Sequence, residues 1–295
     1  MTDSHTLAQN STIHALPRLI LNHADAWGLT LLIGAVFLVL HPPATGQGIL
    51  LVVSLGICYW WGFALNDYFD APHDAQEPKK ALRNFFVQVQ VSRRAIWLMT
   101  GFVLLPVLLI FAQFGWQGWL IFGMGVGAMV GYSAPPFRLK SRPGFDLLTH
   151  MFFVQTFPYF TCFVLLSSSP QPLDAALLSF FLLGSLGAQL EQQIRDYEVD
   201  SRTDTNFTTR FGLGLTIPLL RLVTALLILL VSGCILLGII PLWMVPFALL
   251  ASPVMLHRFL RQGTAPRSEW LIRFALAACI LYAFLLWGAW IIGRF

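Results

Sequence analysis

The chain has 295 residues, of which 57% are hydrophobic and 11% are charged, whereas soluble domains carry about 25% charged residues. This composition excludes an ordinary soluble protein and predicts one integral membrane unit. The formal net charge is +4, but the basic residues form no single tract, so nucleic acid is not an expected partner.

Apolar stretches of near-spanning length follow one another along the chain and predict an all-α bundle of nine transmembrane helices. The second and the sixth are each followed by an acidic cluster, which suggests two four-helix halves plus a ninth helix. We expect a polar tail at 1–25 and a single membrane domain at 26–295. The nine stretches are Ala26–Leu40, Gly48–Leu65, Ala95–Ala112, Trp116–Ser133, Leu147–Leu166, Ala175–Leu190, Leu215–Ile239, Leu242–Leu256 and Ile272–Ile292.

The basic residues predict the orientation, because Lys and Arg near helix ends are retained in the cytoplasm. With nine helices in order, 17 of the 18 Lys and Arg residues fall on the side of the N-terminus, and Arg294 falls on the other side. We therefore expect a cytoplasmic N-terminus. The same assignment places both acidic clusters at the cytoplasmic face of the inner membrane of a bacterial or archaeal cell.

The first acidic cluster reads N-D-Y-F-D-A-P-H-D and follows the second predicted helix. If that helix continues past the membrane edge, Asp67, Asp70 and Asp74 lie at i, i+3 and i+7 and share one face. Like charges on one helix face repel, so they need a compensating cation near a membrane. Mg²⁺ binds carboxylate oxygens together with water and substrate phosphates, which makes this face a predicted Mg²⁺ site.

The second acidic cluster reads R-D-Y-E-V-D-S-R-T-D and follows the sixth predicted helix. Asp196, Asp200 and Asp204 lie at i, i+4 and i+8, again on one helix face. Two such faces meeting across a bundle would hold a magnesium diphosphate between them. Solvated loops are the alternative, but charges of both signs in so apolar a chain favour a functional site. The neighbouring polar residues are Asn66, Lys79, Lys80, Arg83, Arg195 and Arg202.

Three motifs together resemble those of the UbiA superfamily of intramembrane prenyltransferases. The first family motif, N-D-x-x-D-x-x-x-D, matches residues 66–74, and the second, D-x-x-x-D, matches residues 196–200. The family's loop motif Y-S-x-P-P-x-R-x-K follows the fourth predicted helix. Its residues here are Tyr132, Ser133, Pro135, Pro136, Arg138 and Lys140.

The resemblance implies a nine-helix bundle whose Asp motifs bind Mg²⁺ and the diphosphate of a prenyl donor. Mg²⁺ and nearby cationic side chains neutralise the charge on the departing diphosphate. A lipophilic acceptor then attacks the allylic cation, which aromatic rings stabilise by cation–π contacts. The aromatic residues near the motifs are Trp60, Trp61, Tyr68, Phe69 and Tyr132.

The resemblance also implies a role for each matching residue. The implied catalytic residues are Asp67, Asp70, Asp196 and Asp200. The implied metal ligands are Asp67, Asp70, Asp74, Asp196 and Asp200, and the spacing of the second cluster adds Asp204 as a predicted ligand. The implied substrate-binding residues are Asn66, Tyr132, Arg138 and Lys140, and the basic residues beside the Asp clusters, Lys79, Lys80, Arg195 and Arg202, are predicted to bind the substrate with them.

This chain departs from the family pattern at several positions. Asp204 and Asn206 stand where many relatives have Gly and Lys. Beside the first predicted helix, His23 and Asp25 occupy a stretch where many aromatic-acid prenyltransferases have an Arg, which disfavours a benzoate acceptor. The segment E-P-K-K after the first motif is similar to a segment of the branch that prenylates carotenoids, and it favours a very lipophilic, carotenoid-like acceptor over a charged aromatic one. A quinone-type or other aromatic acceptor stays an open alternative.

The predicted function is therefore Mg²⁺-dependent transfer of a prenyl chain to a lipophilic acceptor within the membrane lipid. A terpene cyclase on the same scaffold is an open alternative, because the chain's own double bond can intercept the cation. A cation-coupled transporter is the alternative of another class, but transporter sites lie near the bilayer midplane. A phosphatidyl-type transferase would need a D-G-x-x-A-R run, which is absent from the sequence.

Overall fold

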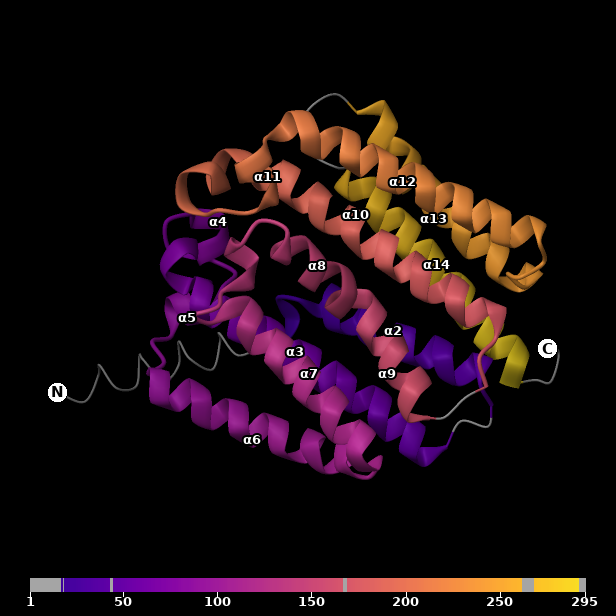
Figure 1. Ribbon diagram of the computed structural model, residues 1–295, viewed down its shortest axis with the longest axis horizontal. Coiled ribbons are helices and arrows are strands. Elements are labelled where there is room, and N and C mark those ends of the chain that lie inside the picture. Colours follow the sequence, from indigo (N-terminus) through magenta and orange to yellow (C-terminus); the bar gives the residue numbers. More distant parts are fainter. Residues whose placement is uncertain (1–16, 18, 43–44, 167–168, 262–267, 292–295) are drawn as a thin grey trace. The chain divides into compact units, whose positions relative to one another are not determined.

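The structure, a computed structural model, describes residues 17, 19–42, 45–166, 169–261 and 268–291. Every regular element in these ranges is a helix, as Figure 1 shows. The all-α class is thereby confirmed. The predicted tail at 1–25 lies largely outside the described residues.

Six helical segments are long and apolar enough to cross a membrane, by length and composition. They support an integral membrane protein, while the count of nine spans and the cytoplasmic N-terminus stay predictions. The six are Gly46–Asp74, Arg93–Ala112, Phe145–Leu165, Pro172–Arg202, Leu213–Leu236 and Leu242–Leu260. Two shorter apolar helices are Ala24–Leu40 and Trp270–Leu286.

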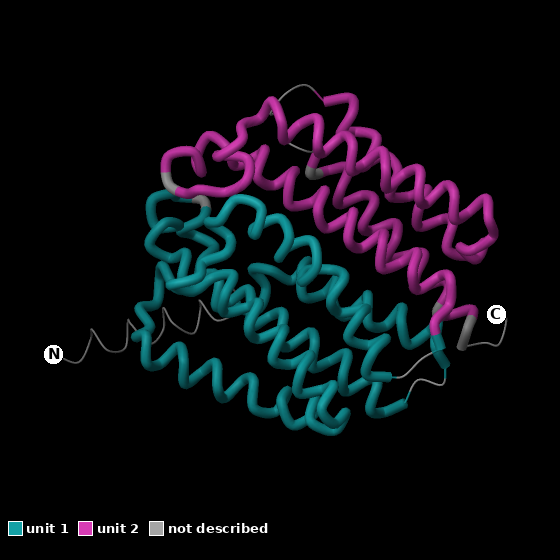
Figure 2. The backbone as a smooth tube through the Cα atoms, in the orientation of Figure 1, with its two compact units in different colours: residues 1–169 teal, residues 170–295 magenta. Residues whose placement is uncertain are grey.

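The chain divides into two compact units, Met1–Ser169 and Pro170–Phe295, which Figure 2 colours separately. The boundary falls after the fifth predicted span, so the units do not coincide with the two predicted four-helix halves. The single membrane domain at 26–295 stays a prediction.

Unit 1 is built around α3 (Gly46–Asp74), against which α2 (Ala24–Leu40), α6 (Arg93–Ala112) and α7 (Gly115–Ser133) pack. Small residues allow α2 and α3 to approach closely: a Cβ on Gly34 would lie 2.7 Å from Val52, and one on Gly56 would lie 2.5 Å from a methyl group of Leu31. Close packing through glycine is typical of membrane helices.

One buried cluster of unit 1 lies between α3, α6 and the segment that joins them. Trp61 of α3 is 1% exposed and donates its indole N–H to the hydroxyl of Thr100 on α6 at 3.0 Å. A buried indole needs such a partner. Trp61 and its neighbours form a cluster with Phe85 and Phe86, against which Trp60, Tyr68 and Phe69 pack. Trp61 is therefore a core residue, and the cation–π role expected for it is not supported.

The remaining helices of unit 1 precede α6 and follow α7 in the sequence. After α3 come α4 (Pro78–Ala81) and α5 (Phe85–Gln88). After α7 the chain passes through the 3₁₀ turn η1 (Leu139–Ser141). It then forms one continuous helical run from α8 (Phe145–Met151) through the π-helical turn η2 (Phe152–Thr156) to α9 (Phe157–Leu165).

Unit 2 contains α10 (Pro172–Thr203), α11 (Phe207–Phe211), α12 (Leu213–Leu236), the 3₁₀ turn η3 (Leu242–Met244), α13 (Val245–Leu260) and α14 (Glu269–Ile291). Pro172 at the first helical position and a capping box between Gln171 and Asp174 start α10. α10 packs against α12, α12 against α13, and α13 against α14. The second Asp motif lies in the last turns of α10.

Candidate functional site

The first Asp motif lies on the last turns of α3. This helix extends nine residues beyond the predicted apolar stretch and ends at Asp74, so the expected helical extension is confirmed. Asp67, Asp70 and Asp74 share its face at the predicted spacing. Each carboxylate has different partners, and in the described part of the chain no three His, Cys, Asp or Glu side chains group tightly enough to hold one metal ion.

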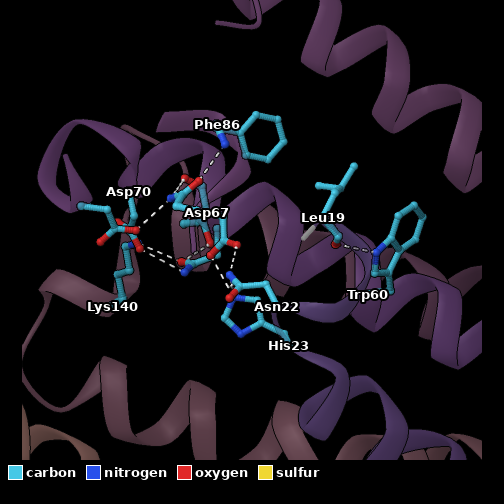
Figure 3. Close-up of polar contacts among 12 residues, drawn as sticks. Leu19, Asn22, His23, Trp60, Asp67, Asp70, Phe86 and Lys140 are labelled. Atoms are coloured by element: carbon cyan, nitrogen blue, oxygen red, sulfur yellow. Dashed lines mark hydrogen bonds and ion pairs between the residues drawn. The ribbon is translucent and has the colours of Figure 1, made fainter. Parts of the chain in front are cut away.

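Asp67 is 8% exposed and is held by the segment that precedes α2. Its carboxylate accepts hydrogen bonds from Asn22 Nδ2 at 2.7 Å and contacts His23 Nε2 at 2.9 Å, as Figure 3 shows. Burial lowers the pKa of His23, but the hydrogen bond with Asp67 and the charges of nearby carboxylates outweigh it, so the pKa is raised above its ordinary value. The positive form of His23 beside Asp67 is thereby favoured.

Asp70 lies among the residues of the predicted loop motif. Lys140 donates to Asp70 and, at 2.8 Å, to the amide oxygen of Asn66. Asn66 Nδ2 donates to Asp70 at 3.0 Å, and Ser133 donates to Asn66 at 3.0 Å. Arg138 Nη2 lies 3.6 Å from Asp70. The structure therefore brings four predicted site residues together, two from α3 and two from the loop after α7.

Arg138 combines two unusual features. Its backbone lies in the left-handed region, with φ of 39° and ψ of 58°. A non-glycine residue there costs about 1–3 kcal/mol, and such residues are concentrated at ligand sites. Its Nε is buried and has no hydrogen-bond partner among the described residues. The guanidinium therefore has an N–H group available for an acceptor.

Asp74 is held by Asn84, which precedes α5. The Asn84 amide donates to the Asp74 carboxylate at 2.8 Å and to the main-chain carbonyl of Asp67 at 2.8 Å. Its oxygen accepts from the amide of Phe86 at 2.8 Å and caps α5. Asn84 thus ties two residues of the motif to the following turn.

Other predicted residues of unit 1 have less specific surroundings. Lys80 forms an ion pair with Glu77 at 3.1 Å, which is typical of a solvated helix end. Lys79 belongs to α4, but its side chain lies outside the described part. Tyr132 lies in the last turn of α7, next to Ser133.

The second Asp motif lies on the last turns of α10, in unit 2. Asp196 forms a two-point ion pair with Arg195, with N–O distances of 2.8 and 3.1 Å. Asp200 accepts from Asn206 Nδ2 at 3.0 Å. Asn206, which replaces a Lys common in relatives, therefore contacts the motif through a neutral amide. Arg202 is exposed in the last turn of α10.

Asp204 does not continue the helical face that the sequence predicted. α10 ends at Thr203, and Asp204 follows it with extended backbone angles, φ of −143° and ψ of 161°. The reason is local. Asn206 is the N-cap of α11, where its side-chain oxygen accepts a hydrogen bond from the main-chain amide of Thr209, so a new helix begins there and α10 ends before it. The carboxylate of Asp204 instead accepts a hydrogen bond from the main-chain amide of Thr205 at 2.8 Å. The metal role of Asp204 stays a prediction, as does joint binding of one diphosphate by the two motifs.

Sequence reasoning missed Asn22, His23 and Asn84 as partners of the first motif. Asn22 and His23 are polar residues at the start of an apolar helix, which was the available signal for them. Asn84 carried a weaker signal, a capping residue four positions before the next polar side chain, Gln88. Neither signal indicates which carboxylate would be contacted.

Comparison with known proteins gives the family. The chain matches the UbiA prenyltransferase family over residues 27–277. The lycopene elongase/hydratase of Corynebacterium glutamicum is 31% identical over 140 residues, which are 47% of this chain and 48% of that protein. The chain thus spans about half the length of the curated relatives it matches.

Solved structures show the same fold. A UbiA homolog from Archaeoglobus fulgidus bound to GPP and Mg²⁺ has a TM-score of 0.65 at 20% identity, covering 90% of this chain and 97% of that one. The apo UbiA homolog from Aeropyrum pernix K1 has a TM-score of 0.66 at 17% identity, covering 92% and 98%. Because the family match covers most of its length, this chain belongs to the UbiA prenyltransferase family.

Proposed function

We propose that the protein is an Mg²⁺-dependent intramembrane prenyltransferase, which moves an isoprenyl chain from a prenyl diphosphate to a lipophilic acceptor through an allylic carbocation. The observation that carries the proposal is the cationic pair of Arg138 and Lys140 at Asp70. Burying a guanidinium N–H without a hydrogen-bond acceptor costs free energy of folding. The Nε of Arg138 is such a buried donor. A diphosphate oxygen would satisfy it with a charge-assisted hydrogen bond.

The donor atoms of the Asp motifs fit Mg²⁺. This ion is usually bound by one or two carboxylates together with water and substrate phosphates, rather than by a complete protein cage. Separate carboxylates with amide and cationic neighbours, such as Asp67 and Asp70, agree with that preference. When bound, Mg²⁺ supplies positive charge against the departing diphosphate. The residues proposed to hold it are Asp67, Asp70, Asp74, Asp196, Asp200 and Asp204.

Several side chains of this protein have proposed roles that need no metal geometry. Arg138 and Lys140 bind the donor's diphosphate oxygens, and Asn66 positions Lys140 through its amide oxygen. Lys79, Lys80, Tyr132, Arg195 and Arg202 are also proposed donor-binding residues, supported by the family motifs and the adjacent charges. Asn22 and His23 hold the carboxylate of Asp67 in a fixed orientation. A site fixed in this way loses less entropy when the donor binds.

The acceptor is proposed to be carotenoid-like. Two observations support this: the segment E-P-K-K after the first motif and the partial match to a lycopene elongase/hydratase. The stretch around His23 has no Arg closer than Arg18 to pair with an acceptor carboxylate, which again favours an uncharged acceptor over a benzoate-type one, and a quinone-type acceptor is the alternative. The proposed location is the inner membrane of a bacterial or archaeal cell, with nine spans, a cytoplasmic N-terminus and a cytoplasmic site.

The proposal is tested with purified full-length protein in lipid nanodiscs. The protein is incubated with Mg²⁺, prenyl diphosphates of several chain lengths and either lycopene or a membrane lipid extract, and the products are identified by mass spectrometry. We expect a prenylated acceptor and stoichiometric diphosphate, both abolished by EDTA and restored by excess Mg²⁺. Diphosphate released without acceptor, together with a cyclic hydrocarbon, would identify a cyclase. No diphosphate release from any donor would refute both.

A further inference from the structure

Unit 2 contains a buried ionic cluster where α10, α12 and α13 come together. Glu191 of α10 accepts from Arg258 Nε at 3.0 Å and Nη2 at 2.9 Å, and from Arg261 Nη1 at 2.7 Å. The three side chains are 5–8% exposed. Arg258 also donates to the hydroxyl of Thr224 on α12 at 3.2 Å. The mechanism proposed above uses none of these residues.

The packing of this cluster depends on a glycine. A Cβ on Gly187 of α10 would lie 2.9 Å from Nη1 of Arg258. The guanidinium therefore occupies space that any other residue at position 187 would fill. The close approach of α10 to Arg258 indicates a site with a defined shape rather than an accidental surface pair.

A third arginine, Arg221 of α12, lies at the same place. With Arg258 and Arg261 it lines a small pocket whose interior volume is about 10 Å³. The Nε of Arg221 is buried and has no hydrogen-bond partner in the described ranges. We call this site the arginine pocket. Its remaining walls are the aliphatic side chains of Ile194, Ile217 and Leu220.

The arginine pocket carries an excess of positive charge. Arginine is always protonated in proteins, and Glu191 pairs with two of the three arginines, Arg258 and Arg261. Among the described residues at the pocket, three guanidinium groups against this carboxylate leave a formal charge of +2. Uncompensated charge near a membrane is costly unless it is paired. The Nε of Arg221 is a buried hydrogen-bond donor that Glu191 does not satisfy. An anion in the pocket would balance the charge and accept that hydrogen bond.

The arginine pocket is separate from the second Asp motif. Glu191 and Asp200 are nine residues apart on α10, and a rotation of about 100° per residue places them on opposite faces of the helix. Asp196 lies about 140° from Glu191 by the same rotation. A diphosphate held by the Asp motif would therefore not occupy the pocket.

We propose that the arginine pocket binds a phosphate-bearing anion. Arginine forks match phosphate oxygens in geometry and charge. Arg258 and Arg261 lie at the end of the candidate span Leu242–Leu260, where lipid headgroups are located, and basic pockets between membrane helices bind anionic headgroups. The narrow interior admits about one water-sized group, so one phosphate oxygen enters while the rest of the phosphate group stays at the mouth. Free inorganic phosphate offers the same chemistry.

The test measures binding and needs no prenyl transfer. Purified full-length protein in neutral detergent is titrated separately with phosphatidylglycerol, phosphatidylcholine and inorganic phosphate at constant ionic strength, and the thermal unfolding midpoint is recorded. We expect phosphatidylglycerol to raise the midpoint and phosphatidylcholine not to. A rise with inorganic phosphate as well would support the site and identify free phosphate as a ligand. No rise with either phosphate ligand would overturn the proposal.

Two variants and one matched control assign the effect to the pocket. Arg221→Gln removes the arginine of the pocket for which the described residues offer no ion pair. We expect the apparent affinity for phosphatidylglycerol to fall at least about tenfold, because one charge-assisted hydrogen bond is lost. Arg273→Gln removes an exposed arginine of α14 and should leave the affinity unchanged. Equal affinities for Arg221→Gln and wild type, or equal losses in both variants, would overturn the proposal.

A second variant covers the case in which Arg221→Gln fails to fold. Ile217→Glu places a carboxylate one helical turn before Arg221, in the pocket wall. This internal anion should abolish the response to phosphatidylglycerol while the lipid-free midpoint equals or exceeds that of wild type. A full response in Ile217→Glu would contradict occupancy of the pocket by a phosphate.

Discussion

Asn84 shows how one buried side chain organises the region after the first Asp motif. It is 2% exposed, and its amide reaches both the Asp67 carbonyl and the Asp74 carboxylate. Its oxygen caps α5. A residue with these contacts positions the end of α3 that carries the proposed donor site.

We predict that Asn84→Ala destabilises the protein. The change leaves the buried carbonyl of Asp67 without its side-chain donor and removes a helix cap, which together cost about 2–4 kcal/mol. The midpoint of thermal unfolding in detergent should fall accordingly. Gln88→Ala, which removes an exposed amide in the same segment, is the control and should leave the midpoint unchanged. Equal midpoints for Asn84→Ala and Gln88→Ala would show that Asn84 contributes little.

We predict that Lys140→Met lowers prenyl transfer by roughly 10- to 100-fold, because a charge-assisted hydrogen bond contributes about 1.5–3 kcal/mol. Lys140 contacts Asp70 and Asn66, so the loss should appear in kcat/KM for the prenyl diphosphate. The matched control is Arg142→Gln in the same loop, whose guanidinium donates to the carbonyl of Pro136 at 3.3 Å. A loss of the same size in Arg142→Gln would indicate a nonspecific charge effect.

At the scale of elements, apolar length and Asp spacing were sufficient to predict the helices that carry the motifs. α3 and α10 both extend beyond the apolar stretches, as the shared Asp faces required. The end of α10 was predicted too late, because the capping role of Asn206 was read only as a departure from the family motif. The contacts of Asp67 with Asn22 and His23 cross more than 40 residues of sequence, and helical periodicity carries no information about such contacts.

The end of α10 yields a prediction about the second motif. Asp200→Asn should lower Mg²⁺-dependent turnover at least 100-fold, since it removes a charge that the proposed metal needs, while the fold is retained because an amide is nearly isosteric. Glu198→Gln, an exposed change on the same helix, is the control and should keep nearly normal activity. Turnover should be measured over a range of Mg²⁺ concentrations. Near-normal activity of Asp200→Asn at all of them would remove Asp200 from the proposed site.

At the scale of the whole molecule, composition predicted a membrane protein and the motifs predicted its family, and both are confirmed. The number of spans was harder to predict from hydropathy alone. α7 is a 19-residue helix with six glycines from residue 115 to residue 131, and it is absent from the candidate spans. Length and apolarity describe single helices, whereas membrane topology depends on all helices and on the charges of every loop.

We predict that Gln76 and Gln113 lie on opposite sides of the membrane, because α6 separates them as one span. Both are exposed, just after α3 and just after α6. In a protein whose native cysteines are replaced by serine or alanine, an impermeant maleimide should label Gln113→Cys in intact cells and Gln76→Cys only after permeabilisation. The reverse pattern would invert the orientation expected from the basic residues. Labelling of both from one side would exclude α6 as a span and, with it, the nine-helix topology.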